Sequence, residues 1–172
     1  MNPFKMFILI AALFCSGLRR QFATANGEST VGRHSTSTTK YADAAHASRH
    51  LLVKIGSDDD HVAVNGVADY PYGLTDDQPA AAGDAINVQF LGSGGTKRLI
   101  ATGALADNVD VYTAANGQVQ GLPSGTVAAI YLIGRTKGAA VQGDDSNYTV
   151  EVETHRPLKA SVTTGTPTVT VI

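Results

Sequence analysis

The chain has 172 residues, 16% of them charged, and a formal net charge of −2. This length suits a single domain, and Lys and Arg residues scattered without a basic stripe exclude a typical nucleic-acid-binding domain. The composition is rich in Gly, Ala, Thr and Val, lacks Trp, and includes one cysteine, Cys15. We therefore expect β-strands packed around an aliphatic core, without an intrachain disulfide.

An apolar run, MFILIAALF, covers residues 6–14 and is flanked by basic residues. Such a run is typical of the hydrophobic part of a signal peptide, with a candidate cleavage site near residues 23–25. It is too short to span a bilayer as a helix, and Phe14 before Cys15 argues against a lipoprotein signal. Two alternatives stay open: the run belongs to a virion arm, or it precedes the true start codon.

The segment after this run is polar. Residues 21–40 are rich in Ser, Thr and Gly and almost free of apolar side chains, which predicts a flexible segment. Residues 40–50, KYADAAHASRH, contain enough alanine for one or two turns of helix. The predicted organisation is thus an N-terminal arm with a signal-like apolar start (1–49), a β-rich domain (50–159) and a Thr/Val-rich tail (160–172).

Strand candidates separated by turn residues follow one another from His50 onward. They cover residues 50–56, 61–66, 71–75, 84–92, 96–103, 127–138 and 147–157, with a hairpin at 110–122. The first two are joined by the acidic turn 57–60, and Pro71 makes the third an edge strand in this interpretation. About eight short strands at this spacing predict a small β-barrel or sandwich.

The clearest strand is residues 84–92. Ile86, Val88 and Phe90 alternate with polar residues, which is the period expected of a half-buried strand. The sequence GSGG at 92–95 then predicts a hairpin connection to a partner strand at 96–103.

Two further patterns indicate how the rest of the domain folds. Asn116-Gly117 inside residues 110–122 favours a hairpin turn with positive φ angles. Residues 127–138 are apolar on both faces and read as a central strand, while residues 147–157 alternate with Tyr148, Val150 and Val152 inward. The tail either adds a final strand or trails.

No pattern in the chain predicts catalysis or a bound cofactor. Asp58 to His61 are consecutive, so in an extended segment their side chains point to opposite faces and do not converge on a metal ion, and they do not fit a calcium-binding loop. The stretch GSGGTKR at 92–98 lacks the spacing of a phosphate-binding loop. The five histidines show no zinc-ligand spacing, and GxSxG is absent. We expect no enzyme, no cofactor and no metal.

Several segments taken in order resemble the bacteriophage capsid decoration proteins, also called structural cement proteins. They are ADAAHASRHLLVKIGSDDDHVAVNG (42–66), YPYGLTDDQPAAAGDAINVQFLG (70–92), GTKRLIATG (95–103), VYTAANGQVQGLP (111–123) and YLIGRTKGAAVQGDDSNYTVEVETHRP (131–157). The resemblance covers about two thirds of the chain, and it depends on order and spacing because no catalytic motif is involved. The apolar start and the tail after Lys159 depart from the family's pattern.

The resemblance implies a small β-barrel or β-tulip domain and a homotrimer on the outer surface of an icosahedral head. Its partner would be the major capsid protein, with the N-terminal arm lying along the shell. It implies no nucleic-acid partner and no membrane in the mature particle. We assign the hypothetical shell contacts of the arm to Arg33, His34, Tyr41 and Arg49.

Two other readings remain open. The first is a secreted or cell-surface β-domain that acts as a binding module, delivered by the N-terminal signal. The second is a small β-barrel enzyme, which would need a convergent polar pocket.

Overall fold

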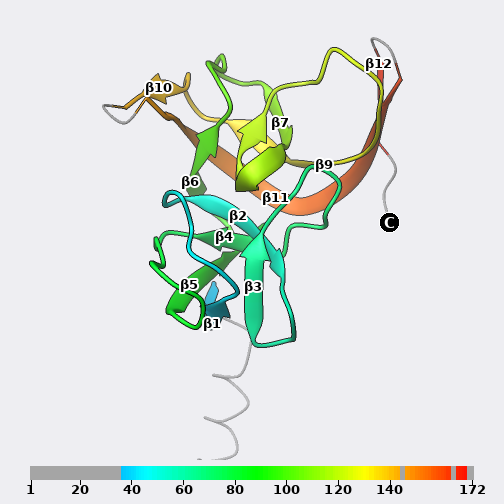
Figure 1. Ribbon diagram of the computed structural model, residues 1–172. Coiled ribbons are helices and arrows are strands. Elements are labelled where there is room, and N and C mark those ends of the chain that lie inside the picture. Colours follow the sequence, from blue (N-terminus) through cyan, green and yellow to red (C-terminus); the bar gives the residue numbers. More distant parts are fainter. Residues whose placement is uncertain (1–35, 144–145, 164–165, 170–172) are drawn as a thin grey trace, which may run out of the picture. The chain divides into compact units, whose positions relative to one another are not determined.

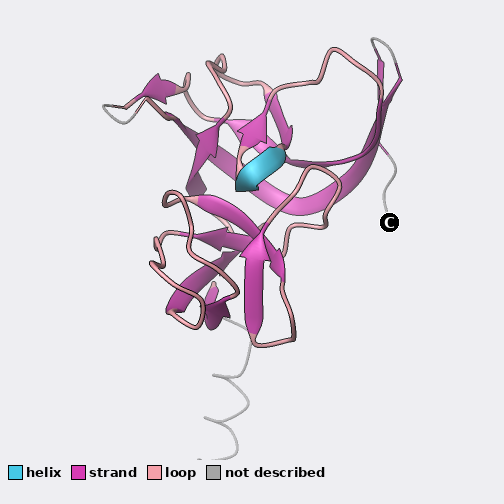
Figure 2. Cartoon of the chain, in the orientation of Figure 1, coloured by secondary structure: helices cyan, strands magenta, loops and turns pink. Residues whose placement is uncertain are grey.

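Strands dominate the computed structural model, which describes residues 36–143, 146–163 and 166–169. There is no α-helix among these residues, and a short 3-10 turn covers Ala115–Gly117 (Figure 2). None of the described helical residues forms a segment long and apolar enough to cross a membrane. The predicted mainly-β class with a β-barrel is confirmed.

The described residues form twelve strands. They are β1 (Ser37–Ala42), β2 (Leu51–Ile55), β3 (His61–Val64), β4 (Gly73–Thr75), β5 (Ala85–Phe90), β6 (Thr96–Ala101), β7 (Asp110–Thr113), β8 (Val119–Gln120), β9 (Val127–Thr136), β10 (Val141–Gln142), β11 (Tyr148–Thr163) and β12 (Thr166–Val169). They belong to two sheets (Figure 1).

The first sheet is a closed barrel with the strand order β1-β3-β2-β4-β5. β1 pairs with β5 antiparallel and with β3 parallel, so it closes the ring. Small and β-branched side chains fill the interior, as a barrel this narrow requires. They are Ala42, Val53, Val62, Ile86 and Val88.

Strand β5 shows how the sequence sets the register of this barrel. Ile86 and Val88 are buried, whereas Asn87 is exposed. Phe90 is half-buried and its ring meets Tyr72 edge to face at 5.5 Å between centroids. The predicted inward face of this strand is confirmed, because the alternation of side chains matches the pleat.

The second sheet follows the order β10-β11-β6-β8-β7-β9, and β11 also pairs with β9. The pairings β11-β6-β8-β7-β9-β11 therefore run in a closed circuit. Its core contains Leu99, Val111, Val119, Ile133 and other buried side chains. β12 pairs with β11 outside this circuit.

The first barrel contributes directly to the core of the second sheet. Leu52 and Leu74, which pair across β2 and β4, are fully buried in that second core. Val53, the next residue of β2, instead belongs to the barrel interior. Successive residues of a strand point to opposite faces, so β2 serves two cores at once.

Strand β11 is the longest element and bends strongly (Figure 1). Its pairing with β9 shifts register between Thr154 and Leu158, so the ladder is interrupted there. Pro157 lies in the shifted stretch, where a residue without an N–H is tolerated. β11 pairs with β6 from Tyr148 to Glu153, and with β9 both before the shift, at residues 152–154, and after it, from Leu158 onward.

The predicted Asn-Gly turn is present between β7 and β8. Asn116 has φ 57° and ψ 34°, and Gly117 has φ 69°. The strands pair as Tyr112 with Gln120 and Thr113 with Val119, so the connection is longer than a two-residue turn.

The predicted boundary of the domain at residue 50 needs correction. β1 begins at Ser37, inside the segment expected to be flexible, and residues 43–50 form bends instead of the expected helical turns. The prediction weighed side-chain polarity, but β1 is held by main-chain pairing with two strands. Only Ala42 of this strand is fully buried in the barrel.

Other predicted pairings are also corrected. β6 pairs with β11 and β8 instead of β5, although GSGG connects it to β5. β4 is not an edge strand, because β2 and β5 flank it. Within the predicted tail, β11 continues to Thr163 and Thr166–Val169 forms β12. Long-range pairing decides these points, and local sequence does not encode it.

Candidate functional site

Two of the four predicted shell contacts lie in the described part of the chain. Tyr41 is 46% exposed on β1, and its ring lies 5.7 Å from that of His61 on β3. Arg49 is exposed in the β1–β2 loop, residues 43–50. Arg33 and His34 lie outside the described residues, as does the apolar run at 6–14. The structure gives no contact between Tyr41 and Arg49.

The β1–β2 loop lies beside the β4–β5 connection, residues 76–84, and is hydrogen-bonded to it (Figure 1). The His46 N–H donates to the Pro79 carbonyl at 3.0 Å, and the Gln78 side-chain amide donates to the Ala47 carbonyl at 3.0 Å. His50 Nδ1 lies 3.0 Å from the Asp76 carboxylate. This loop is therefore positioned by three contacts with the same connection.

A groove of about 500 Å³, which we call the Arg49 groove, lies beside this loop. Its lining residues are Ala47, Ser48, Arg49, His50, Gln78, Ile100, Asn147 and Thr149. A second groove of about 330 Å³ shares Ala47, Ser48 and Asn147 with it. The second groove is completed by Ala45, Leu51, Val64, Asn116 and Gln118.

The two grooves combine apolar walls and hydrogen-bonding groups in similar proportion. Among the polar lining groups hydroxyls and amides predominate, Arg49 supplies a cation, and neither groove is lined by a carboxylate. Ser48, His50 and Asp76 are the residue types of a nucleophile, a base and an orienting acid. However, the Ser48 hydroxyl makes no hydrogen bond to His50 in the described structure, so the set lacks its first link. The grooves therefore offer hydrogen-bonding groups for polar contacts.

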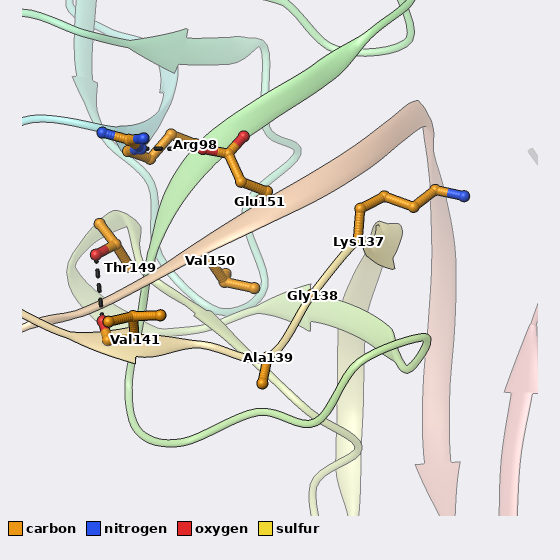
Figure 3. Close-up of a pocket in the computed structure, with 8 residues that line it drawn as sticks. All are labelled: Arg98, Lys137, Gly138, Ala139, Val141, Thr149, Val150 and Glu151. Atoms are coloured by element: carbon orange, nitrogen blue, oxygen red, sulfur yellow. Dashed lines mark hydrogen bonds and ion pairs between the residues drawn. The ribbon is translucent and has the colours of Figure 1, made fainter.

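A third pocket, of about 290 Å³, lies on the second sheet and is lined by Arg98, Lys137, Gly138, Ala139, Val141, Thr149, Val150 and Glu151. Arg98 and Lys137 point in opposite directions (Figure 3). Arg98 Nε lies 3.0 Å from Glu151, and Lys137 Nζ lies 2.6 Å from Glu153 outside the pocket. The Lys137 ammonium holds the pKa of Glu153 below its ordinary value. The two cations beside this pocket are thus paired with neighbouring carboxylates, and they do not point toward a common position in it.

The acidic turn before β3 forms a local hydrogen-bonded pair. His61 Nδ1 lies 2.7 Å from Asp58, and the N–H of Asp60 also donates to Asp58 at 2.9 Å. The hydrogen bond with Asp58 raises the pKa of His61, and the same bond lowers the pKa of Asp58. Among the described residues no group of His, Cys, Asp and Glu side chains is arranged to hold a metal ion.

Sequence reasoning missed the grooves because their walls come from distant segments. Arg49, Gln78, Ile100 and Asn147 are far apart in the chain and carry no common motif. The Asn116-Gly117 signal located one wall of the second groove, but it predicted a turn and not a surface for binding.

Comparisons of the chain with known protein families, curated proteins and solved structures found no match.

Proposed function

We propose that the protein is a non-enzymatic virion protein that decorates an icosahedral phage head and stabilises it by binding the major capsid protein. The proposal depends on one observation: the segments that resemble the decoration proteins map, in order, onto strands of both sheets. The resembling segments, taken in order, supply strands from β2 and β3 through to β9, β10 and most of β11. The resemblance thus extends through both sheets of the domain.

The charges on the surface of the domain are compatible with binding to a large protein assembly. Arg98 pairs with Glu151, Arg135 with Asp110 and Lys137 with Glu153, all on half-exposed or exposed side chains. Exposed pairs of this kind contribute little to stability, but they leave a surface of low net charge. Such a surface meets many identical copies of a partner without long-range repulsion.

The proposed attachment has two parts. The segment before β1 is polar over residues 21–35 and would lie along the shell, where an extended chain can cover a large surface. Tyr41 and Arg49 would add contacts from the domain itself. A homotrimer, as in the resembled family, would multiply these weak contacts through avidity.

Mass spectrometry of purified phage particles tests the proposal directly. The intact chain should be present in amounts comparable with the major capsid protein. A chain cleaved near residue 25, found in the medium and absent from particles, would refute a virion role.

Co-sedimentation with undecorated heads tests the attachment. Removal of residues 1–35 should weaken binding strongly, whereas Tyr41→Ala and Arg49→Ala should weaken it by smaller factors. Gln142→Ala, at an exposed position of β10, is the control and should bind like the intact protein. If the truncated protein bound equally well, attachment would have to be assigned to the domain alone.

The alternative function is a secreted or cell-surface binding module. It is favoured by one observation, the apolar run at 6–14 with basic flanks. In that case the hydroxyl- and amide-lined grooves would be the binding surface, and release of a processed chain into the medium would support it.

A further inference from the structure

His46 is a buried histidine whose imidazole has no hydrogen-bond partner. The residue is 5% exposed, and neither Nδ1 nor Nε2 finds a partner among the described residues. Its backbone is bonded, because the N–H donates to the Pro79 carbonyl at 3.0 Å. Buried polar groups without partners are rare in folded proteins, so each one needs a reason.

The charged groups of the two segments around His46 either have other hydrogen-bond partners or, in the case of Arg49, are exposed. They are Asp43, Arg49 and His50 on its own loop, and Asp76, Asp77 and Asp84 on the β4–β5 connection. Asp43 accepts hydrogen bonds from Ser57, and Asp84 accepts them from the N–H groups of Ala80 and Ala81.

The other charged groups of these two segments also have hydrogen-bond partners or lie at the surface. Asp76 is shared by His50 and Gln89, and Asp77 accepts the N–H of Asn87. Arg49 is exposed at the groove. The residues that line the second groove next to Ala45 and Ala47 are uncharged. No described carboxylate is therefore hydrogen-bonded to an imidazolium at position 46.

Protonation would put a charge with two N–H donors into a place that offers no acceptor. Burial disfavours the charged form, and accordingly it lowers the pKa of His46 below the ordinary value of 6.5. If the loop lifted away, water would solvate the ring and the ordinary pKa would return.

We propose that His46 is an acid-sensitive latch, which holds the β1–β2 loop on the β4–β5 connection while neutral and releases it when protonated. Ala47, Ser48, Arg49 and His50 belong to the same loop, so its release would dismantle the Arg49 groove. Mild acid would thus remove one polar surface while the two cores remain packed.

Proton linkage gives the direction in which pH shifts the equilibrium between the closed and the open loop. The open state binds a proton below pH 6.5, whereas the closed state does so only at lower pH. Closure is therefore fully favoured above 6.5 and weakens as the pH falls through that value. Between pH 7.5 and 5.0 the population of the open state should rise, by at most about 30-fold for one proton.

Hydrogen–deuterium exchange of the full-length protein tests this, with rates corrected for the intrinsic effect of pH. Peptides covering residues 43–50 should lose protection between pH 7.5 and 5.0, while peptides from β9 and β11 stay protected. His46→Leu, which cannot titrate, should abolish the change. His50→Gln is the matched control and should keep it, because His50 has Asp76 as a partner.

Two results would overturn the latch: unchanged protection of this loop in the wild-type protein, or the same loss of protection in His46→Leu. If His46→Leu does not fold, an NMR titration of the wild-type imidazoles decides the question. A His46 pKa below that of a solvent-exposed histidine supports the latch, and a value equal to or above it refutes the latch.

Discussion

Gly117 donates its backbone N–H to the carbonyl oxygen of Asn65 over 2.7 Å, and this bond joins the β7–β8 turn to the segment that follows β3. There is also no room for a side chain at Gly117. A Cβ on Gly117 would lie 2.6 Å from the Leu52 carbonyl oxygen, and the residue has φ 69°. The turn therefore needs a residue with both a positive φ and no side chain.

Gly117→Ala should destabilise the domain by roughly 2–4 kcal/mol, because strain at positive φ adds to a clash with backbone. Gly95→Ala is the matched control: its φ is 71°, but a Cβ there meets nothing within 4 Å. It should cost only about 1–2 kcal/mol. Urea unfolding followed by circular dichroism gives both values. Equal losses would show that the contact with Leu52 is not tight in solution.

Val88→Lys should prevent stable folding, since Val88 is 0% exposed inside the barrel and an unpaired buried charge costs several kcal/mol. Asn87→Lys places the same charge on the exposed neighbour and should change the free energy of unfolding by less than about 0.5 kcal/mol. Thermal unfolding compares the two. Similar stability of both variants would mean that the register of β5 is inverted.

Removal of residues 1–35 should leave the barrel intact, whereas removal of 1–49 should unfold it. The longer deletion takes away β1, and with it the pairings that β3 and β5 make to close the ring. Circular dichroism and the heat of unfolding distinguish the two proteins. A cooperative transition in the 1–49 deletion, at an unchanged temperature, would show that β1 is dispensable.

Asp58→Asn should lower the pKa of His61 toward 6.5, since the hydrogen bond that the imidazole donates to the Asp58 carboxylate is the main cause of the upward shift. Folding gains from this pair below pH 6.5 while Asp58 stays ionised, and the gain is lost as the pH rises through the pKa of folded His61. NMR titration of the imidazole measures the change. His155 serves as the internal reference, and an unmoved His61 would contradict the assignment.

The local features of this fold could be read from sequence. The alternation around Ile86 and Val88, the apolar faces of β9 and the Asn116-Gly117 turn each depend on neighbours within a few residues. The identity of pairing partners depends on distant chain segments, so the sequence led to β5 and β6 being paired when each belongs to a different sheet. β1 was missed for the same reason, because its stability comes from the strands on either side.

Gln89 is a single side chain whose role could not be predicted from the sequence. Alternation places it on the polar face of β5, where a substitution would be expected to cost little. In the structure its amide donates to the Asp76 carboxylate, so Gln89→Asp would set two carboxylates against each other. The Arg49 groove was equally hidden, since its walls come from four separate segments.

The sharing of Leu52 and Leu74 between the two sheets also imposes an order on biosynthesis. All strands of the first barrel lie within residues 37–90, so they leave the ribosome before β9 and β11 are translated. The barrel can close early, but Leu52 and Leu74 then face water until the strands of the second core arrive. During that interval the nascent chain carries an uncovered apolar surface, which is the kind of surface that chaperones bind and that favours aggregation.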